Sequence, residues 1–178
     1  NSRFMATGAN GGTTISGTDF TTSDPQTLGL FYVRIRRTSA TECKVAIYSN
    51  SDYSTSTLVE EETVTITSGL TGLRYLKLTN LTVSGAGTGV FNGTMDNVKY
   101  YNSTTSTTTP ATWTMPPTHE IDLSSSTGWT QVTNTNSEVT GGELIGLVNS
   151  SSTNGDGIWK DSGISFSDTA FVFRCKFQ

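Results

Sequence analysis

The stretch FNGTMDNVKYY at residues 91–101 indicates the last strand of a β-sandwich domain, yet it lies in the middle of a 178-residue chain. The segment that follows, residues 102–118, is rich in Ser, Thr and Pro, a composition typical of an extended linker. The sequence of residues 119–178 then looks like the start of another domain. The order therefore predicts the second half of one module at 1–101, a linker at 102–118 and the first half of the next module at 119–178.

Alternation of apolar and polar residues predicts where the strands lie. Residues 31–36 and 42–47 alternate strictly, and the segment between them is short enough for a hairpin turn. Further strands are expected at residues 62–67, 73–78, 89–101, 129–132, 142–147, 157–160 and 171–178. The acidic run Glu60–Glu62 is expected to be the polar start of its strand, and Arg34 and Arg36 are expected on a solvated face of the sheet. No helical period competes, so the fold class is all-β, an antiparallel sandwich.

Composition excludes several classes of partner. The formal net charge is -4 with a pI of about 4.9, and the longest basic run is Arg34–Arg37, so nucleic acid is excluded as a partner. No apolar stretch approaches the ~20 residues of a membrane span, so no membrane insertion is expected. Ser and Thr make up roughly a third of the chain, which is typical of secreted β-proteins and Thr-rich stalks. We therefore expect an extracellular location, on a cell or virion surface.

Several segments resemble a known family. Residues 1–101 resemble the second half of the concanavalin A-like (laminin G-like) jelly rolls found in large microbial and phage surface proteins. The segments that carry this resemblance are LFYVRIRRTSAT at 30–41, VAIYS at 45–49, GLRYLK at 72–77 and GTMDNV at 93–98. Segments that resemble the opening half of the same module are DLSSSTGWT at 122–130, GGEL at 141–144 and SDTAFVFR at 167–174. The resemblance implies an antiparallel jelly-roll β-sandwich.

The same resemblance implies a function. We expect a non-catalytic structural or adhesive module of a repeat surface protein, fibre or filament, whose partners are neighbouring copies of itself or adjacent repeats. The alternative is a carbohydrate-binding, lectin-like module with glycans as partners. Three arrangements stay open: a window on a repeat array, halves that pair between neighbouring subunits, and a circularly permuted domain closed within the chain. We also expect the chain to be cut from a longer protein, because it begins without Met and stops within an alternating strand.

One acidic segment resembles a catalytic motif. EIDLSS at residues 120–125 resembles the start of the glucanase motif of concanavalin-like hydrolases, in which two glutamates flank an aspartate. Retaining hydrolysis needs two carboxylates about 5–5.5 Å apart, and the second glutamate position is Ser125, so no catalytic residues are expected. His119 is the single histidine and is expected to be a solvated linker residue, which leaves no Ser/His/Asp triad. By the resemblance, Asp96 and Asp122 match positions that hold a structural calcium ion in some jelly rolls, and carboxylates suit calcium.

Glycans enter the expectations in two ways. Acceptor sequons for N-glycosylation are found at Asn80, Asn92, Asn102 and Asn149. For glycan binding, an exposed aromatic ring stacks on a sugar beside polar loop groups. Trp159 is the first candidate for such a ring, followed by Tyr53 and Trp113, with packing in the core or at a sheet edge as the alternative role for each.

The two cysteines, Cys43 and Cys175, both fall on the apolar side of an alternating strand. They are not in a CxxC arrangement and do not form a metal site by themselves. Two buried thiols and a cross-sheet disulfide both stay open.

Overall fold

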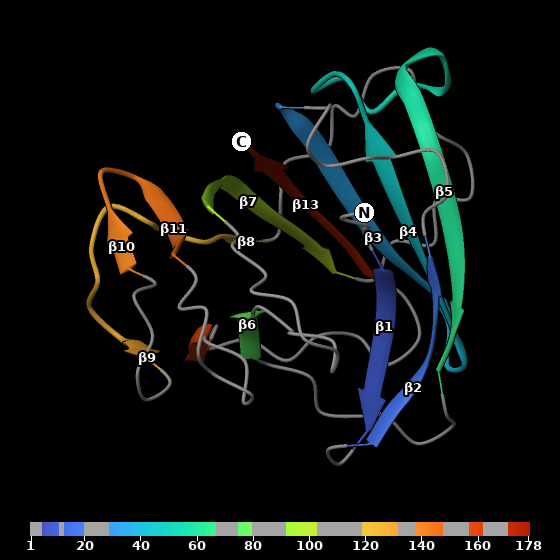
Figure 1. Cartoon of the computed structure of the whole chain (residues 1–178), viewed down its shortest axis with the longest axis horizontal. Coiled ribbons are helices and arrows are strands. Elements are labelled where there is room, and N and C mark those ends of the chain that lie inside the picture. The colour runs from blue at the N-terminus through green and yellow to red at the C-terminus, as the bar shows by residue number, and fades with distance from the viewer. Residues whose placement is uncertain are drawn as a thin grey trace, which may run out of the picture. The chain divides into compact units, whose positions relative to one another are not determined.

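The structure is a computed structural model that describes residues 5–10, 13–19, 29–66, 75–79, 92–102, 119–131, 138–147, 157–161 and 171–178. In these residues the regular structure is β-strand, apart from one 3-10 turn, η1 (Thr55–Thr57) (Figure 1). The strand pairs set out below run antiparallel. The all-β, antiparallel prediction is therefore confirmed. The chain forms two compact units.

Unit 1 comprises Asn1–Leu73, Asn97–Glu120 and Phe166–Gln178. Its strands are β1 (Met5–Asn10), β2 (Thr13–Asp19), β3 (Phe31–Ser39), β4 (Glu42–Tyr48), β5 (Leu58–Thr65), β8 (His119–Glu120), β13 (Phe171–Phe177) and the second part of β7 (Asn92–Asn102). Its main sheet has the order β7-β13-β3-β4-β5, with β8 paired to β7. The β1–β2 hairpin forms a separate two-stranded sheet beside β5.

Unit 2 comprises Arg74–Asp96 and Ile121–Ser165. Its strands are β6 (Tyr75–Thr79), β9 (Trp129–Gln131), β10 (Glu138–Thr140), β11 (Glu143–Leu147), β12 (Gly157–Asp161) and the first part of β7. They pair in the orders β10-β11-β7 and β6-β12-β9. Gly141 and Gly142 connect β10 to β11 with φ values of 61° and 85°, a left-handed conformation that glycine adopts at little cost in a two-residue hairpin turn.

The last strand of the chain joins the sheet of the first half. β13 pairs with β3 along its whole length, from Phe171 opposite Arg37 to Phe177 opposite Phe31. The rings of Phe31 and Phe177 stack with centroids 5.4 Å apart, and Figure 1 shows the dark red β13 beside the blue β3. The expected boundaries at residues 101 and 119 therefore do not separate the sheets, because β3 from the first expected half and β13 from the second lie in one sheet. For these strands, pairing is closed within the chain.

One face of this sheet is an apolar core. Phe31, Ile47 and Val64 are buried together, and the side chains packed against them are Val33, Val45, Val59 and Phe177. On β3 and β4 they come from alternate positions, Phe31 with Val33 and Val45 with Ile47, as the sequence predicts. On β5, Val59 and Val64 are five residues apart, and the register shift in the β4–β5 pairing accounts for their common face.

Two expectations about local structure were wrong. β5 begins at Leu58, so Glu60–Glu62 lies inside the strand, where these three residues pair with β4 from Val45 to Ile47. His119 lies in β8, and its backbone pairs with Tyr100 of β7 instead of continuing a linker. In both cases pairing with a neighbouring strand overrides the polar local sequence.

We expect Ile47→Ala to destabilise unit 1 by about 2–4 kcal/mol, because Ile47 is 1% exposed and truncation leaves a cavity in the apolar face. Thr65→Ala, at an exposed position of β5, is the control and should change stability by less than about 0.5 kcal/mol. Urea unfolding followed by circular dichroism measures both. Equal, small effects would mean that this face is not a packed core.

Candidate functional site: a buried arginine–tyrosine cluster

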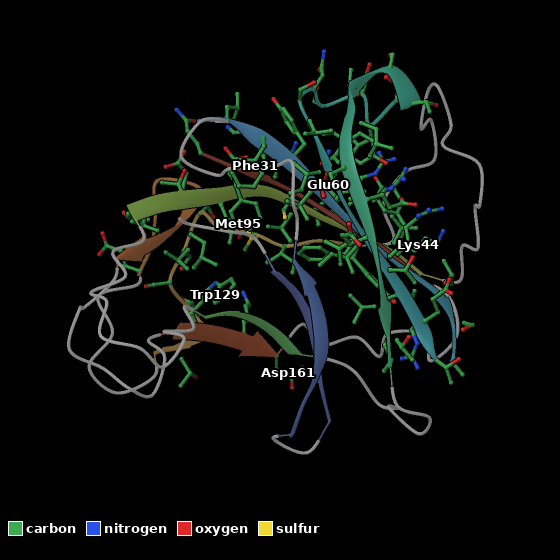
Figure 2. All side chains as sticks on the ribbon, turned by 45° about the vertical axis from the view of Figure 1, so that its right-hand side comes forward. Phe31, Lys44, Glu60, Met95, Trp129 and Asp161 are labelled. Atoms are coloured by element: carbon green, nitrogen blue, oxygen red, sulfur yellow. The ribbon has the colours of Figure 1, made fainter. Side chains whose placement is uncertain are left out.

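The second face of the sheet in unit 1 carries arginines and tyrosines, and it is buried. Arg34 on β3 lies directly opposite Arg174 on β13, and Tyr32 lies opposite Tyr48 on β4. The exposed fractions are 1% for Arg34, 7% for Arg36 and 6% for Arg174. The expectation of a solvated face for Arg34 and Arg36 is therefore wrong. Side chains stand on both faces of β3, β4 and β5 in Figure 2.

Aromatic rings cover the guanidinium groups. The Arg34 Cζ lies 4.9 Å from the centroid of the Tyr48 ring, and the Arg174 Cζ lies 4.2 Å from that of Tyr53 and 5.5 Å from that of Tyr101. A cation over the face of an aromatic ring is stabilised by about 0.5–2 kcal/mol, more when water is excluded. We call the arginine–tyrosine cluster the set of Arg34, Arg36, Arg174, Tyr32, Tyr48, Tyr53, Tyr101 and Glu61.

A tight loop carries Tyr53 into the cluster. The Oδ1 of Asp52 accepts hydrogen bonds from the backbone N–H of Ser54 (3.0 Å) and the hydroxyl of Thr57 (2.7 Å). Tyr53 has a φ of 51°, a left-handed conformation that a non-glycine residue adopts only when its surroundings hold it there. Its hydroxyl donates to the carbonyl of Cys175 at 3.3 Å. Tyr53 is 5% exposed, so its ring packs in the interior of the unit, which is the alternative role named for it, and is not an exposed ring for stacking on a sugar.

The carboxylate of Glu61 on β5 connects three cations. Its Oε2 lies 3.0 Å from Nη2 of Arg36 and 3.5 Å from Nη2 of Arg34, and its Oε1 lies 3.7 Å from Nζ of Lys44. Ala46 of β4 lies in register between Arg34 and Glu61. With strands about 4.8 Å apart, the small Ala46 leaves room for the two long side chains to meet across it. From the sequence, Glu61 was expected only as part of the polar start of a strand. In the structure it is the acidic partner of these cations.

Some polar atoms of the cluster make no hydrogen bond. Among them are Nε and Nη1 of Arg34 and the hydroxyl of Tyr48, all buried. Burial lowers the pKa of Arg34 and of Arg174, because a charged guanidinium loses its hydration. Burial raises the pKa of Tyr48 and of Tyr53, because the phenolate would lose its hydration. The cluster therefore holds neutral phenols against arginines whose charge is poorly solvated.

The residues predicted for calcium lie in unit 2. Asp122 is exposed, and its Oδ1 accepts a hydrogen bond from the backbone N–H of Ser124 at 2.8 Å. Hydrogen bonds from the side chain and backbone of Ser124 lower the pKa of Asp122. Asp96 lies half-buried in β7. Within the described residues no three His, Cys, Asp or Glu side chains gather as a metal-binding group, so the calcium site stays a prediction.

The glucanase-like segment has structural contacts. Glu120 lies in β8, and its Oε1 forms an ion pair with Nζ of Lys99 on β7 at 3.0 Å. The Glu120 side chain is 59% exposed. Ser125, at the position of the absent second glutamate, donates its hydroxyl to Oγ1 of Thr127 at 2.9 Å. Both groups have a partner from the protein itself.

The remaining predicted residues stay predictions. The backbone of Trp159 lies in β12, opposite Lys77 and Thr130, and its side chain lies outside the described part. Asn92 opens β7 and Asn102 closes it. Positions outside the described residues are Asn80, Trp113 and Asn149.

No disulfide joins Cys43 and Cys175. Cys175 lies opposite Val33 and Cys43 opposite Arg37, so the two thiols flank β3 at positions four residues apart. At about 3.3 Å per residue this separation exceeds the ~7 Å between Cα atoms that a disulfide can span. Of the two alternatives, separate thiols are what the structure has.

Comparison with protein-family models, with curated proteins and with solved structures found no match. In the described part of the chain, no helix has the length and apolar content that a membrane crossing requires.

Stability should fall at alkaline pH. Burial raises the pKa of the Cys43 thiol from 9.0 to about 11, and the pKa values of Tyr48 and Tyr53 move in the same direction. The folded chain therefore holds these protons more tightly than the unfolded chain. Their contribution to stability is complete below pH ~9 and declines as pH rises through ~11.

Urea unfolding at pH ~8 and pH ~10.5 measures this decline, and absorbance at 295 nm follows phenolate formation. We expect Tyr48 and Tyr53, two of the six tyrosines, to ionise only when the chain unfolds. Ionisation of all six near pH ~10 with native circular dichroism would contradict the burial of this cluster.

Proposed function

We propose that this chain is a non-catalytic, extracellular structural or adhesive module of a repeat surface protein, fibre or filament, built as a concanavalin A-like jelly-roll sandwich. The all-β architecture and the Ser/Thr-rich, weakly charged composition support this proposal. Its partners are neighbouring copies of the chain or adjacent repeats.

The observation that carries the proposal is an apolar end on unit 1. Among the side chains that the structure describes, the exposed large hydrophobics are Leu30, at 41%, and Leu58, at 37%. Leu30 precedes the first residue of β3, and Leu58 opens β5. The register from Tyr32 to Tyr48 and from Tyr48 to Leu58 brings both leucines to the same end of the sheet. These two leucines offer exposed apolar surface at one end of the sheet, where a neighbouring module could pack.

The chemistry of the acidic segment also supports a non-catalytic role. Hydrolysis of a glycoside by retention needs a second carboxyl group as acid and base. Ser125 occupies that position and its hydroxyl bonds to Thr127, while Glu120 is engaged with Lys99. In the described part these groups stabilise local structure.

Sedimentation velocity tests the proposal. We expect the parent chain to sediment faster as its concentration rises to ~1 mM, since contacts between repeats are weak in isolation. The double variant Leu30→Lys/Leu58→Lys should remain monomeric over the same range. Thr65→Lys adds a charge at the opposite, exposed end of β5 and is the matched control, which should associate like the parent.

A parent chain that stays monomeric at every concentration, or a double variant that associates equally well, would contradict assembly through this end. Binding of such a monomer to a glycan array, lost in Trp159→Ala, would favour the carbohydrate-binding function in its place. Release of reducing sugar from β-glucans that is lost in Glu120→Gln would overturn the non-catalytic proposal.

A further inference from the structure

Arg34 and Tyr48, in the arginine–tyrosine cluster, have buried polar atoms that lack a hydrogen-bond partner. Arg34 is 1% exposed and Tyr48 is 0% exposed. Neither Nε nor Nη1 of Arg34 makes a hydrogen bond, and neither does the Tyr48 hydroxyl. In native proteins the great majority of such buried groups bond to protein, to ordered water or to an ion. These atoms are therefore buried donors that an acceptor of hydrogen bonds would satisfy.

The charge of Arg34 indicates which acceptor it is. Among the described residues, the carboxylate paired with Arg34 is that of Glu61. It lies 3.5 Å from Arg34 Nη2, compared with 3.0 Å from Arg36 Nη2, and it also contacts Lys44 Nζ. Arg174 lies directly opposite Arg34 on the adjacent strand, so a like charge is added at close range. A buried charge without a full counter-charge is costly, and a water molecule offers hydrogen bonds but no charge. An anion offers both.

We propose that Arg34 and Tyr48 hold a small monovalent inorganic anion, of the size of chloride or bromide, inside unit 1. The anion accepts from an N–H of Arg34 and from the hydroxyl of Tyr48. Stacking already places the guanidinium over the Tyr48 ring, at 4.9 Å, so the two donors belong to neighbouring groups. Arg174 lies opposite Arg34 on β13, so a second cation stands beside this stacked pair.

The anion is a resident stabiliser and does not deliver the proposed function. Because its donors are buried, it binds the folded chain and leaves on unfolding. Its presence should therefore raise the melting temperature in a saturable way, since a ligand that binds only the folded state stabilises that state by mass action.

Thermal unfolding in sodium chloride, sodium bromide and sodium methanesulfonate, at one fixed ionic strength, tests the proposal. Chloride and bromide should raise the melting temperature by ~3 °C or more with saturation, whereas the bulkier methanesulfonate should not. Bromide soaked into crystals should give an anomalous peak between Arg34 and Tyr48.

Two variants isolate the site. Tyr48→Phe keeps the ring on Arg34 and removes one donor, and it should weaken the apparent halide affinity at least ~5-fold. Tyr53→Phe is the matched control: it removes a hydroxyl that already donates to Cys175, so it should lower stability but leave the halide dependence intact. Equal melting temperatures in all three salts, or an unchanged halide dependence in Tyr48→Phe, would overturn the proposal in favour of buried water.

Discussion

One carboxylate, that of Glu61, organises the buried polar face of unit 1. From β5 it reaches across β4 to Arg34 and Arg36 on β3, and it also contacts Lys44 on β4. Glu61 is partly exposed, at 23% of its side chain, while the two arginines are nearly inaccessible. Since Glu61 contacts all three cations from β5, the burial of this face is conditional on the position of that strand. The pairing of β5 with β4 places Glu61 opposite Ala46, which is why that position cannot be large.

Tyrosines provide the rest of the environment that the arginines need. Stacking over Tyr48 and Tyr53 replaces part of the hydration lost by Arg34 and Arg174. The left-handed backbone at Tyr53 is the local cost of bringing its ring there, and hydrogen bonds to Asp52 around it hold that conformation. The two faces of the sheet are thus both dry, one by hydrocarbon contacts and one by ion pairs and ring stacking.

The sequence was informative about strands and misleading about one face. Alternation predicted β3, β4 and β13 and the apolar side that contains Ile47, because side-chain period follows directly from strand geometry. The same alternation was taken to mean that Arg34 meets solvent, which assumes a sheet with one wet side. Tyrosines at the alternate positions, Tyr32 and Tyr48, were the available signal that this side also packs.

Long-range pairing was outside what the sequence could predict. Nothing local to β13 distinguishes β3 as its partner from a strand of another copy, because both would cover its edge equally well. The short strand β8 is likewise defined by its partner: Lys99 of β7 pairs with Glu120, and the polar sequence around His119 gives no signal of its own. The glycan and calcium residues depend on side-chain arrangements that no pattern in the chain specifies.

A double-mutant cycle between Glu61 and Arg36 tests most directly whether this carboxylate organises the buried face. The four proteins are the parent, Glu61→Gln, Arg36→Gln and the double variant, each unfolded in urea. A cycle of Glu62→Gln with Arg36→Gln is the control, because Glu62 lies opposite Val45 on the apolar face. We predict a coupling free energy of about 1 kcal/mol or more for Glu61 and none beyond error for Glu62. Additive effects of Glu61→Gln and Arg36→Gln, within about 0.5 kcal/mol, would contradict the organising role of Glu61.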